Sequence, residues 1–264
     1  MSVRISDMMG AVRLKRPLVH HITNYVTVND CANICICAGG SPVMTDEAKD
    51  IPEMVALASA VVLNIGTLNE RTISSMILAG KCANEKNIPV ILDPVGVGAT
   101  TYRTETAWKI LNKVKVSVIK GNSGEIAVLA GAGGEVKGVD SISGSEGTGA
   151  VLALSKKTGA IVASTGKIDY ISDGKKVYVL RNGDDYLGTV SGTGCMVSSV
   201  IGCYVGACGV TAEAVACGIS AFNIAAEIAA EKAFGPGSFK TKLFDSIYGL
   251  DEKEAATRLN YEEE

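Results

Sequence analysis

Signatures of several large protein classes are missing from this chain of 264 residues. It contains no C-x-x-C pair, which removes support for a zinc ribbon or a thioredoxin-type site. It also has neither a G-x-x-x-x-G-K-[ST] loop nor a G-x-G-x-x-G loop, so a P-loop enzyme and a Rossmann dehydrogenase lose their strongest support. The net charge of −3 gives no electrostatic footprint for nucleic acid, and we expect no nucleic-acid partner.

Uninterrupted hydrophobic segments of membrane-spanning length are missing as well. The longest apolar stretches, 196–210 and 215–230, are broken by glycine, serine or glutamate, which is typical of buried helices. The opening residues 1–16 mix charges throughout and do not resemble a signal peptide. Most of the eight cysteines lie among small or β-branched residues, which suits free thiols in a reducing cytosol. We therefore expect a cytoplasmic protein without a membrane partner.

Short apolar runs alternate with segments of helical periodicity along most of the chain. Strands are predicted at 18–22, 61–65, 90–92, 116–119 and 160–163. Helices are predicted between and after them at 27–38, 50–59, 69–87, 103–113, 122–130 and 147–157. This alternation predicts a three-layer α/β sandwich, with a mostly parallel central sheet flanked by helices. No linker or repeat divides the sequence, so we expect a single domain over residues 1–264.

The C-terminal third departs from this alternation. Residues 170–172 and 177–179 surround Asp173-Gly174 and predict a hairpin at one edge of the sheet. Three helices are then predicted at 194–206, 211–233 and 238–258, with Gly235-Pro236-Gly237 separating the last two. The acidic residues 262–264 are expected to be a solvated end.

The stretch Gly192-Thr193-Gly194-Cys195 stands where one of these helices is predicted to begin. Backbone N–H groups at a helix start are unpaired and carry partial positive charge, so they can hold a phosphate or an oxyanion without arginine. Cys195 would point at the same place, and its thiol is expected to be more acidic than in water. A glycine turn followed by a small buried cysteine is the alternative interpretation, and these four residues alone do not decide between the two.

Polar residues and glycines also follow every predicted strand, where ligands collect in open α/β sheets. Asp93 ends one strand, and Glu125 stands one helical turn after Asn122 at the start of another helix. Such carboxylates could organise magnesium and its waters over a nucleotide phosphate. Alternatively, Glu125 satisfies the helix dipole and Asp93 caps the glycine turn that follows it.

Three further positions could have either a functional or an ordinary role. Lys120 is a candidate cation beside phosphates, or a solvated lysine at a strand end. Thr165 could contact a nucleotide, or it could merely turn the chain toward the hairpin. His20 and His21 are the only histidines, and a catalytic role for either needs a geometry that the sequence does not show.

Taken together, these motifs resemble the hydroxyethylthiazole kinases of the ribokinase-like superfamily. The resemblance rests on Asn24 with the helix after it, the turn 93–98, Asn122-x-x-Glu125, and Gly192–Cys195, in that order along residues 19–234. The wider superfamily has aspartate where Cys195 stands, and cysteine is the mark of the thiazole kinases. The resemblance implies an ATP-dependent kinase for 4-methyl-5-(2-hydroxyethyl)thiazole in thiamine biosynthesis or salvage, without a separate lid domain.

The resemblance also implies roles for individual residues. Cys195 and Gly194 would be catalytic, and Asp93 and Glu125 would act through Mg²⁺. The expected ATP-binding residues are Lys120, Asn122 and Thr165, and the expected substrate-binding residues are Asn24, Met44 and Gly192. Lys120 departs from the arginine expected there, which keeps the charge but loses the planar fork.

Family members form trimers with the thiazole site at the subunit interface, so a homotrimer is expected here too. Three other functions remain open at this stage. One is a ribokinase-like kinase for another vitamin-precursor alcohol, of the hydroxymethylpyrimidine or pyridoxal type. Another, from a different class, is a thiol hydrolase that pairs Cys195 with His20 or His21. A nucleotide-binding regulatory module without turnover is a further alternative.

Overall fold

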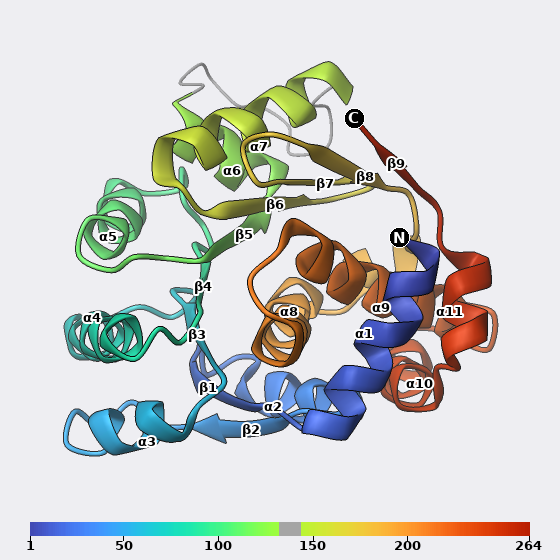
Figure 1. Cartoon of the computed structure of the whole chain (residues 1–264), viewed down its shortest axis with the longest axis horizontal. Coiled ribbons are helices and arrows are strands. Elements are labelled where there is room, and N and C mark those ends of the chain that lie inside the picture. Colours follow the sequence, from blue (N-terminus) through green and yellow to red (C-terminus); the bar gives the residue numbers. More distant parts are fainter. Residues whose placement is uncertain (132–143) are drawn as a thin grey trace.

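A mixed sheet is the middle layer of the fold in the computed structural model, which describes residues 1–131 and 144–264 (Figure 1). Its strands within those ranges are β1 (Leu18–Ile22), β2 (Ser41–Met44), β3 (Ala60–Asn64), β4 (Val90–Asp93), β5 (Val118–Asn122), β6 (Ile161–Thr165), β7 (Asp169–Ser172), β8 (Val177–Leu180) and β9 (Tyr261–Glu263). The strand order is β2-β1-β3-β4-β5-β6-β7-β8-β9. Strands β2 to β6 pair in parallel, and β6 to β9 pair antiparallel.

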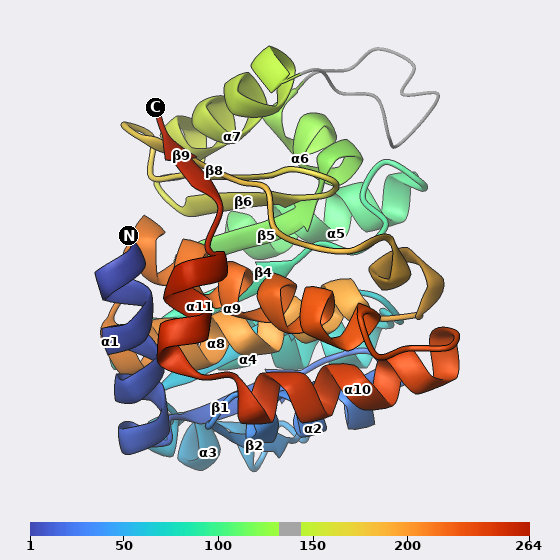
Figure 2. The same ribbon diagram turned by 90° about the vertical axis from the view of Figure 1, so that its right-hand side faces the viewer.

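Helices cover both faces of this sheet. In the described ranges they are α1 (Ser2–Lys15), α2 (Val28–Cys37), α3 (Ile51–Leu57), α4 (Glu70–Glu85), α5 (Thr101–Leu111), α6 (Ser123–Ala130), α7 (Gly144–Thr158), α8 (Thr193–Cys208), α9 (Ala212–Ala230), α10 (Pro236–Gly249) and α11 (Glu252–Arg258), with a short 3₁₀ helix, η1 (Asp185–Thr189). Helices α3 to α7 lie on one face, and α1, α2 and α8 to α11 lie on the other (Figures 1 and 2). The predicted three-layer α/β sandwich is confirmed.

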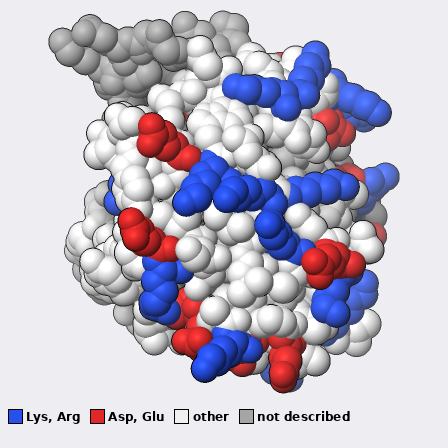
Figure 3. Space-filling view, turned by 90° about the vertical axis from the view of Figure 1, so that its left-hand side faces the viewer, with Lys and Arg blue, Asp and Glu red and all other residues white. Residues whose placement is uncertain are grey.

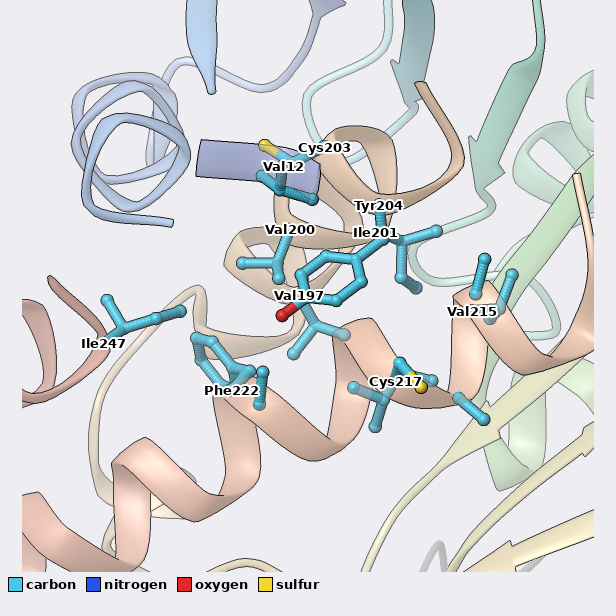
Figure 4. Close-up of a cluster of buried hydrophobic side chains, with 14 of the residues drawn as sticks. Val12, Val197, Val200, Ile201, Cys203, Tyr204, Val215, Cys217, Phe222 and Ile247 are labelled. Carbon is cyan, nitrogen blue, oxygen red and sulfur yellow. The ribbon is translucent and has the colours of Figure 1, made fainter. Parts of the chain in front are cut away.

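Helix α8 is fixed in the middle of one of these layers by apolar packing. Val197, Val200, Ile201 and Tyr204 of α8 pack with Val215 and Phe222 of α9, and Val12 of α1 joins the same cluster (Figure 4). Close to the sheet there is no room for a larger side chain, because a Cβ at Gly202 would lie 2.8 Å from Val19 Cγ1. The start of α8 is therefore set firmly at the edge where the parallel strands end.

The predicted strands and hairpin are all present, with shifts of one to three residues at their ends. Strand β1 has the predicted bounds, whereas β5 begins two residues late and runs on through Lys120 to Asn122. Helix α1 was missed, although Ile5, Met9 and Val12 bury one face of it at helical spacing. Strand β2 was also missed, because it is short and contains a proline, which only an edge strand tolerates.

The predicted helix 238–258 is wrong in its bounds, since α10 and α11 replace it. Pro236 stands in the first turn of α10, where its missing N–H has no cost, so α10 begins inside the predicted break. The chain turns at Asp251, whose carboxylate accepts from the backbone N–H groups of Lys253 and Glu254 and caps α11. The acidic end is only partly as expected, because 261–263 pair with β8 while Glu262 and Glu263 stay exposed.

The charged surface and the apolar helices can be placed in the fold. On the face covered by α3 to α5, basic side chains form a band with acidic side chains beside it (Figure 3). One ion pair of α4 joins Arg71 Nη2 to Asp46 Oδ2 over 2.7 Å. Helix α9 is long and apolar enough to cross a bilayer, but 89% of that stretch is buried inside the fold. It is a core helix. All eight cysteines are free thiols, as predicted.

Candidate active site

The carboxyl ends of four parallel strands bring polar side chains together at one edge of the sheet. Asn64 at the end of β3 is in register with Asp93 at the end of β4, and Asn122 at the end of β5 is in register with Thr165 of β6. The N-terminus of α8 meets this edge. Both expected metal ligands, the predicted ATP-binding residues and Cys195 therefore come from neighbouring elements.

The start of α8 presents unpaired backbone donors. Gly192 is the N-cap with φ 87°, and the Met196 N–H donates to its carbonyl oxygen over 3.0 Å. Within the described ranges, the N–H groups of Thr193, Gly194 and Cys195 have no hydrogen-bond acceptor. Three N–H donors with the helix dipole behind them form a site for an anionic group. This favours the anion-binding interpretation of the Gly192–Cys195 stretch.

Cys195 lies between two side-chain amides. Asn24 Nδ2 and Asn64 Nδ2 donate to its Sγ atom over 3.3 and 3.2 Å. The expectation of an unusually acidic thiol is wrong. Burial raises the Cys195 pKa, the charge of Asp93 raises it further, and Lys120 offsets this only in part. The thiol is therefore protonated at neutral pH.

Asp93 is buried, and one of its two carboxylate oxygens is surrounded by hydrogen-bond donors. Oδ2 accepts from Ser198 Oγ over 2.7 Å and from Asn64 Nδ2 over 3.1 Å, and it lies 3.6 Å from Lys120 Nζ. Asp93 therefore does not cap the glycine turn after it. For Oδ1, no hydrogen bond is found among the described residues, so this oxygen remains free to accept at the site.

Lys120 is a buried cation, not the solvated lysine of the alternative interpretation. Its Nζ atom donates to the carbonyl oxygen of Gly194 over 2.9 Å, and only 5% of the side chain is exposed. Burial alone would lower the pKa of Lys120, but Asp93 and then Glu125 outweigh it and the pKa is raised. Lys120 thus keeps its charge and fixes the first turn of α8.

Glu125 has the ordinary role that the sequence left open, and it also supports a neighbouring loop. Asn122 and Glu125 form a capping box, in which each side chain accepts from the other's backbone N–H over 2.8 and 2.7 Å. Glu125 Oε1 also accepts from the Gly96 N–H over 2.7 Å. Burial raises the Glu125 pKa, Asp93 raises it further, and Lys120 opposes both.

The donor set fits a magnesium ion that arrives with a nucleotide better than a resident metal. No group of three or more His, Cys, Asp or Glu side chains that could hold a metal is found in residues 1–131 and 144–264. Mg²⁺ keeps several waters and is bound through one or two carboxylates plus substrate phosphates. Asp93 Oδ1, which has no hydrogen bond among the described residues, is a carboxylate oxygen that could serve in this way.

The remaining predicted residues differ in how close they lie to Cys195. Thr165 Oγ1 donates to the Gly121 carbonyl over 3.3 Å, which links β6 and β5 at their carboxyl ends. Asn24 is buried beside Cys195, and its Oδ1 accepts from the N–H and the hydroxyl of Thr27. Met44 ends the edge strand β2 and is half-buried there.

Neither histidine is arranged to activate Cys195. The His20 ring bonds the carbonyl of Thr45 over 2.8 Å. The His21 ring bonds the Val19 carbonyl and Ser199 Oγ, and burial lowers its pKa to about 4. Among the described residues neither ring is hydrogen-bonded to Cys195, and His20 Nδ1 is buried without a partner, which removes the basis for a thiol hydrolase.

Two site residues were missed from the sequence. Asn64 was included in a predicted strand, and its amide links Asp93, Cys195 and Asn24. Ser198 was one of several small residues in an apolar helix. Asn64 could have been found by its place at a strand end, whereas Ser198 has no signal beyond standing one turn after Cys195.

Comparisons with known proteins agree on one family. Residues 9–253 match the profile of the hydroxyethylthiazole kinase family. The chain is 52% identical over 253 residues to a hydroxyethylthiazole kinase of Methanocella arvoryzae, covering 96% of this chain and 95% of that protein. The structure of a hydroxyethylthiazole kinase protein from Pyrococcus horikoshii OT3 is similar with a TM-score of 0.92 and 41% identity, and 99% of both chains is covered.

A more distant likeness concerns the fold alone. A ribokinase-like superfamily protein from Enterococcus faecalis has a TM-score of 0.67 at 11% identity, with 94% of both chains covered. The layered sheet thus has a ribokinase-like architecture.

Proposed function

Because the chain belongs to the hydroxyethylthiazole kinase family and is therefore an enzyme that transfers phosphoryl groups from ATP, we propose that it phosphorylates the hydroxyl of 4-methyl-5-(2-hydroxyethyl)thiazole in thiamine salvage. The observation that carries this proposal is the start of α8, where three unpaired N–H groups adjoin Cys195, Asp93 and Lys120. We further propose that residues 1–264 act as one cytoplasmic domain, which the free thiols support.

Phosphoryl transfer needs positioning and charge neutralisation more than a strong base, because its transition state is loose. The N–H groups of Gly194 and Cys195 would donate to the oxygens of the moving phosphoryl group. Lys120 would add positive charge behind them, while Asn122 and Thr165 would face the nucleotide. The protonated, weakly acidic thiol of Cys195 would hydrogen-bond the reacting hydroxyl rather than remove its proton beforehand.

Asp93 and Glu125 are the residues that would hold Mg²⁺ through its waters. When bound, the ion would neutralise charge on the nucleotide phosphates. Asp93 would accept through its free Oδ1. Glu125 would act at longer range, since both of its oxygens already accept from backbone N–H groups.

The thiazole would lie on the opposite side of Cys195 from the nucleotide, next to Asn24 and Gly192. Met44, at the end of the edge strand β2, would reach the thiazole site of a neighbouring copy in a homotrimer. Tyr25 and Val26 support an interface there, because they are exposed by 78% and 61% in the loop after β1. Sedimentation should show a trimer, and a fully active monomer would remove this part of the proposal.

The proposed reaction can be tested with a panel of small heterocyclic alcohols, ATP and magnesium, read by mass spectrometry. The thiazole alcohol is expected to gain one phosphate, and hydroxymethylpyrimidine and pyridoxal much less. Preferred phosphorylation of either of the other two would identify the enzyme as a kinase for another vitamin precursor. ATP binding without any phosphorylated product would identify a regulatory module.

Cys195→Ala is expected to lower kcat about tenfold to a hundredfold and to leave measurable kinase activity. The reason is that the N–H donors at the start of α8 survive the substitution. Cys195→Asp is expected to be more active than the alanine variant, because Asn24 and Asn64 already direct donors at this position. Steady-state kinetics decide both points, and a folded, ATP-binding alanine variant without activity would contradict the first.

A further inference from the structure

Asp169 is a buried carboxylate on the nucleotide side that the proposed reaction leaves without a role. It is the first residue of β7, directly after the turn that leaves β6, and only 2% of it is exposed. Its side chain faces back toward this turn: Oδ1 accepts from the Gly166 N–H over 2.9 Å. Burying a carboxylate costs folding free energy unless the group is hydrogen-bonded or paired with a charge, so the partners of Asp169 indicate its role.

The second carboxylate oxygen of Asp169 connects the β6–β7 turn to helix α9. Oδ2 accepts from Asn223 Nδ2 of α9 over 2.7 Å, and the same nitrogen donates to the Asn182 carbonyl over 3.0 Å. Asn182 in turn donates to Glu227 Oε1 over 2.9 Å. One carboxylate thus joins the β6–β7 turn, α9 and the segment after β8 into a single hydrogen-bonded unit.

We infer that Asp169 is a positioning residue for ATP, which holds the turn 165–168 in the shape that receives the nucleotide. This inference rests on the proposed kinase function, with Thr165 on the nucleotide side. The Gly166 N–H is the backbone donor next to Thr165, and Asp169 is its acceptor. Without that acceptor, the side-chain contact that remains at the turn is the one from Thr165 to Gly121 at 3.3 Å, beside the pairing of β6 with β5 and β7.

The charge of Asp169 changes within the working pH range of most enzymes. Burial raises its pKa to about 7, although the Gly166 N–H, Asn223 and Lys120 each oppose that shift. Because the folded pKa is raised, the ionised carboxylate is present above about pH 7 and is lost as the pH falls below it. Protonation places a hydrogen on an oxygen that now faces a donor, so the turn is held best above neutrality.

The charged and polar groups around Asp169 come from β5, from the turn after β6 and from α9. Lys120, from β5, has a raised pKa and stays protonated. The Gly166 turn and Asn223 of α9 offer neutral donors. Glu227, one turn further along α9, is engaged with Asn182 and the Gly183 N–H.

The test is the affinity for a non-hydrolysable ATP analogue with magnesium, measured by calorimetry between pH 6 and 8 on wild type and Asp169→Asn. The variant is expected to bind about tenfold more weakly at pH 8, since it loses the charged acceptor. Its affinity should change less with pH than that of wild type, because the variant lacks the carboxylate that titrates. The ionisation of the nucleotide is common to both proteins and does not contribute to this difference. In turnover, KM for ATP should rise about tenfold, while kcat and KM for the thiazole alcohol change less than about twofold.

Matched variants separate this role from a merely structural one. Asp173→Asn removes an exposed carboxylate in the neighbouring β7–β8 turn, where it accepts only from the backbone N–H groups of Lys175 and Lys176, and it should bind like wild type. Asn223→Ser removes one partner of Asp169 and should weaken binding in the same direction, even where Asp169→Asn does not fold. Equal affinity and equal pH dependence in folded Asp169→Asn or Asn223→Ser would overturn the inference.

The two proposals fail in different ways. Wild type that binds the analogue but does not phosphorylate the thiazole alcohol contradicts the proposed function and leaves this binding test intact. Wild type that phosphorylates the alcohol but loses no affinity on these substitutions contradicts the role of Asp169. Wild type that binds no nucleotide contradicts both.

Discussion

Replacing Gly192 by alanine is expected to lower kcat/KM about a hundredfold or more. A Cβ at this position would lie 2.1 Å from Thr27 Cγ2, and the φ of 87° is strained for any side chain. Thr27 has to move, and with it Asn24, which accepts from the Thr27 N–H and hydroxyl and donates to Cys195. The measurement is steady-state kinetics together with thermal unfolding.

The same helix offers a matched control at its other end. Gly209 has a φ of 88°, and a Cβ there meets nothing within 4 Å. Gly209→Ala carries a backbone strain at least as large as that of Gly192→Ala, because its ψ is 168° where that of Gly192 is 6°, but it carries no collision. It should lose stability and retain activity, whereas Thr27→Ser should restore part of the activity of Gly192→Ala. Equal loss of activity in both alanine variants would show that strain, rather than the contact with Thr27, is responsible.

Asp93→Asn is expected to lower kcat about a thousandfold. Asp93 Oδ2 is surrounded by donors from Ser198 and Asn64 and lies beside Lys120. The asparagine amide has one acceptor oxygen and one donor nitrogen. If the NH₂ faces Ser198 and Asn64, donor meets donor, and if it faces the site, the acceptor of Oδ1 is lost there. The buried Lys120 also loses its counter-charge, which costs about 3–5 kcal/mol of folding free energy.

Two companion variants distinguish charge from packing at Asp93. Ser198→Ala removes one donor and keeps the carboxylate, so we expect about a tenfold loss of kcat. Adding Lys120→Met to Asp93→Asn removes the unpaired charge, and it should raise the melting temperature without restoring activity. A folded Asp93→Asn enzyme with more than about a tenth of wild-type turnover would contradict the central place given to this residue.

Much of the fold could be predicted because hydrophobic periodicity reports what is buried. The apolar residues of β1, β3 and β4 are buried in the sheet, and the bounds of these strands were predicted within one residue. Strand β2 contains too few residues and a proline, so its pairing with β1 is decided by tertiary contacts. The buried residues of helix α1 are interspersed with charged residues, and its packing on α8 and α11 cannot be predicted from the sequence.

Residues of the candidate site could be predicted from the sequence where they end a strand or begin a helix, but not where they stand inside one. Asp93 and Gly192–Cys195 were found because strand ends and helix starts are read locally. Ser198 and Asn64 act through contacts between residues 105 and 131 positions apart, to Asp93 and Cys195. The direction of the Cys195 pKa was wrong for the same reason, since a helix start favours a thiolate locally and only the fold shows its burial beside Asp93.

The amide of Asn64 has a consequence for where a proton can travel. Its nitrogen donates both to Asp93 and to Cys195 and can accept from neither, so it insulates the thiol from the nearest carboxylate. No proton relay can run from Cys195 through Asn64 to Asp93. A proton that leaves the substrate hydroxyl therefore cannot reach Asp93 by way of Cys195 and Asn64, and any transfer to Asp93 has to be made directly to its free Oδ1.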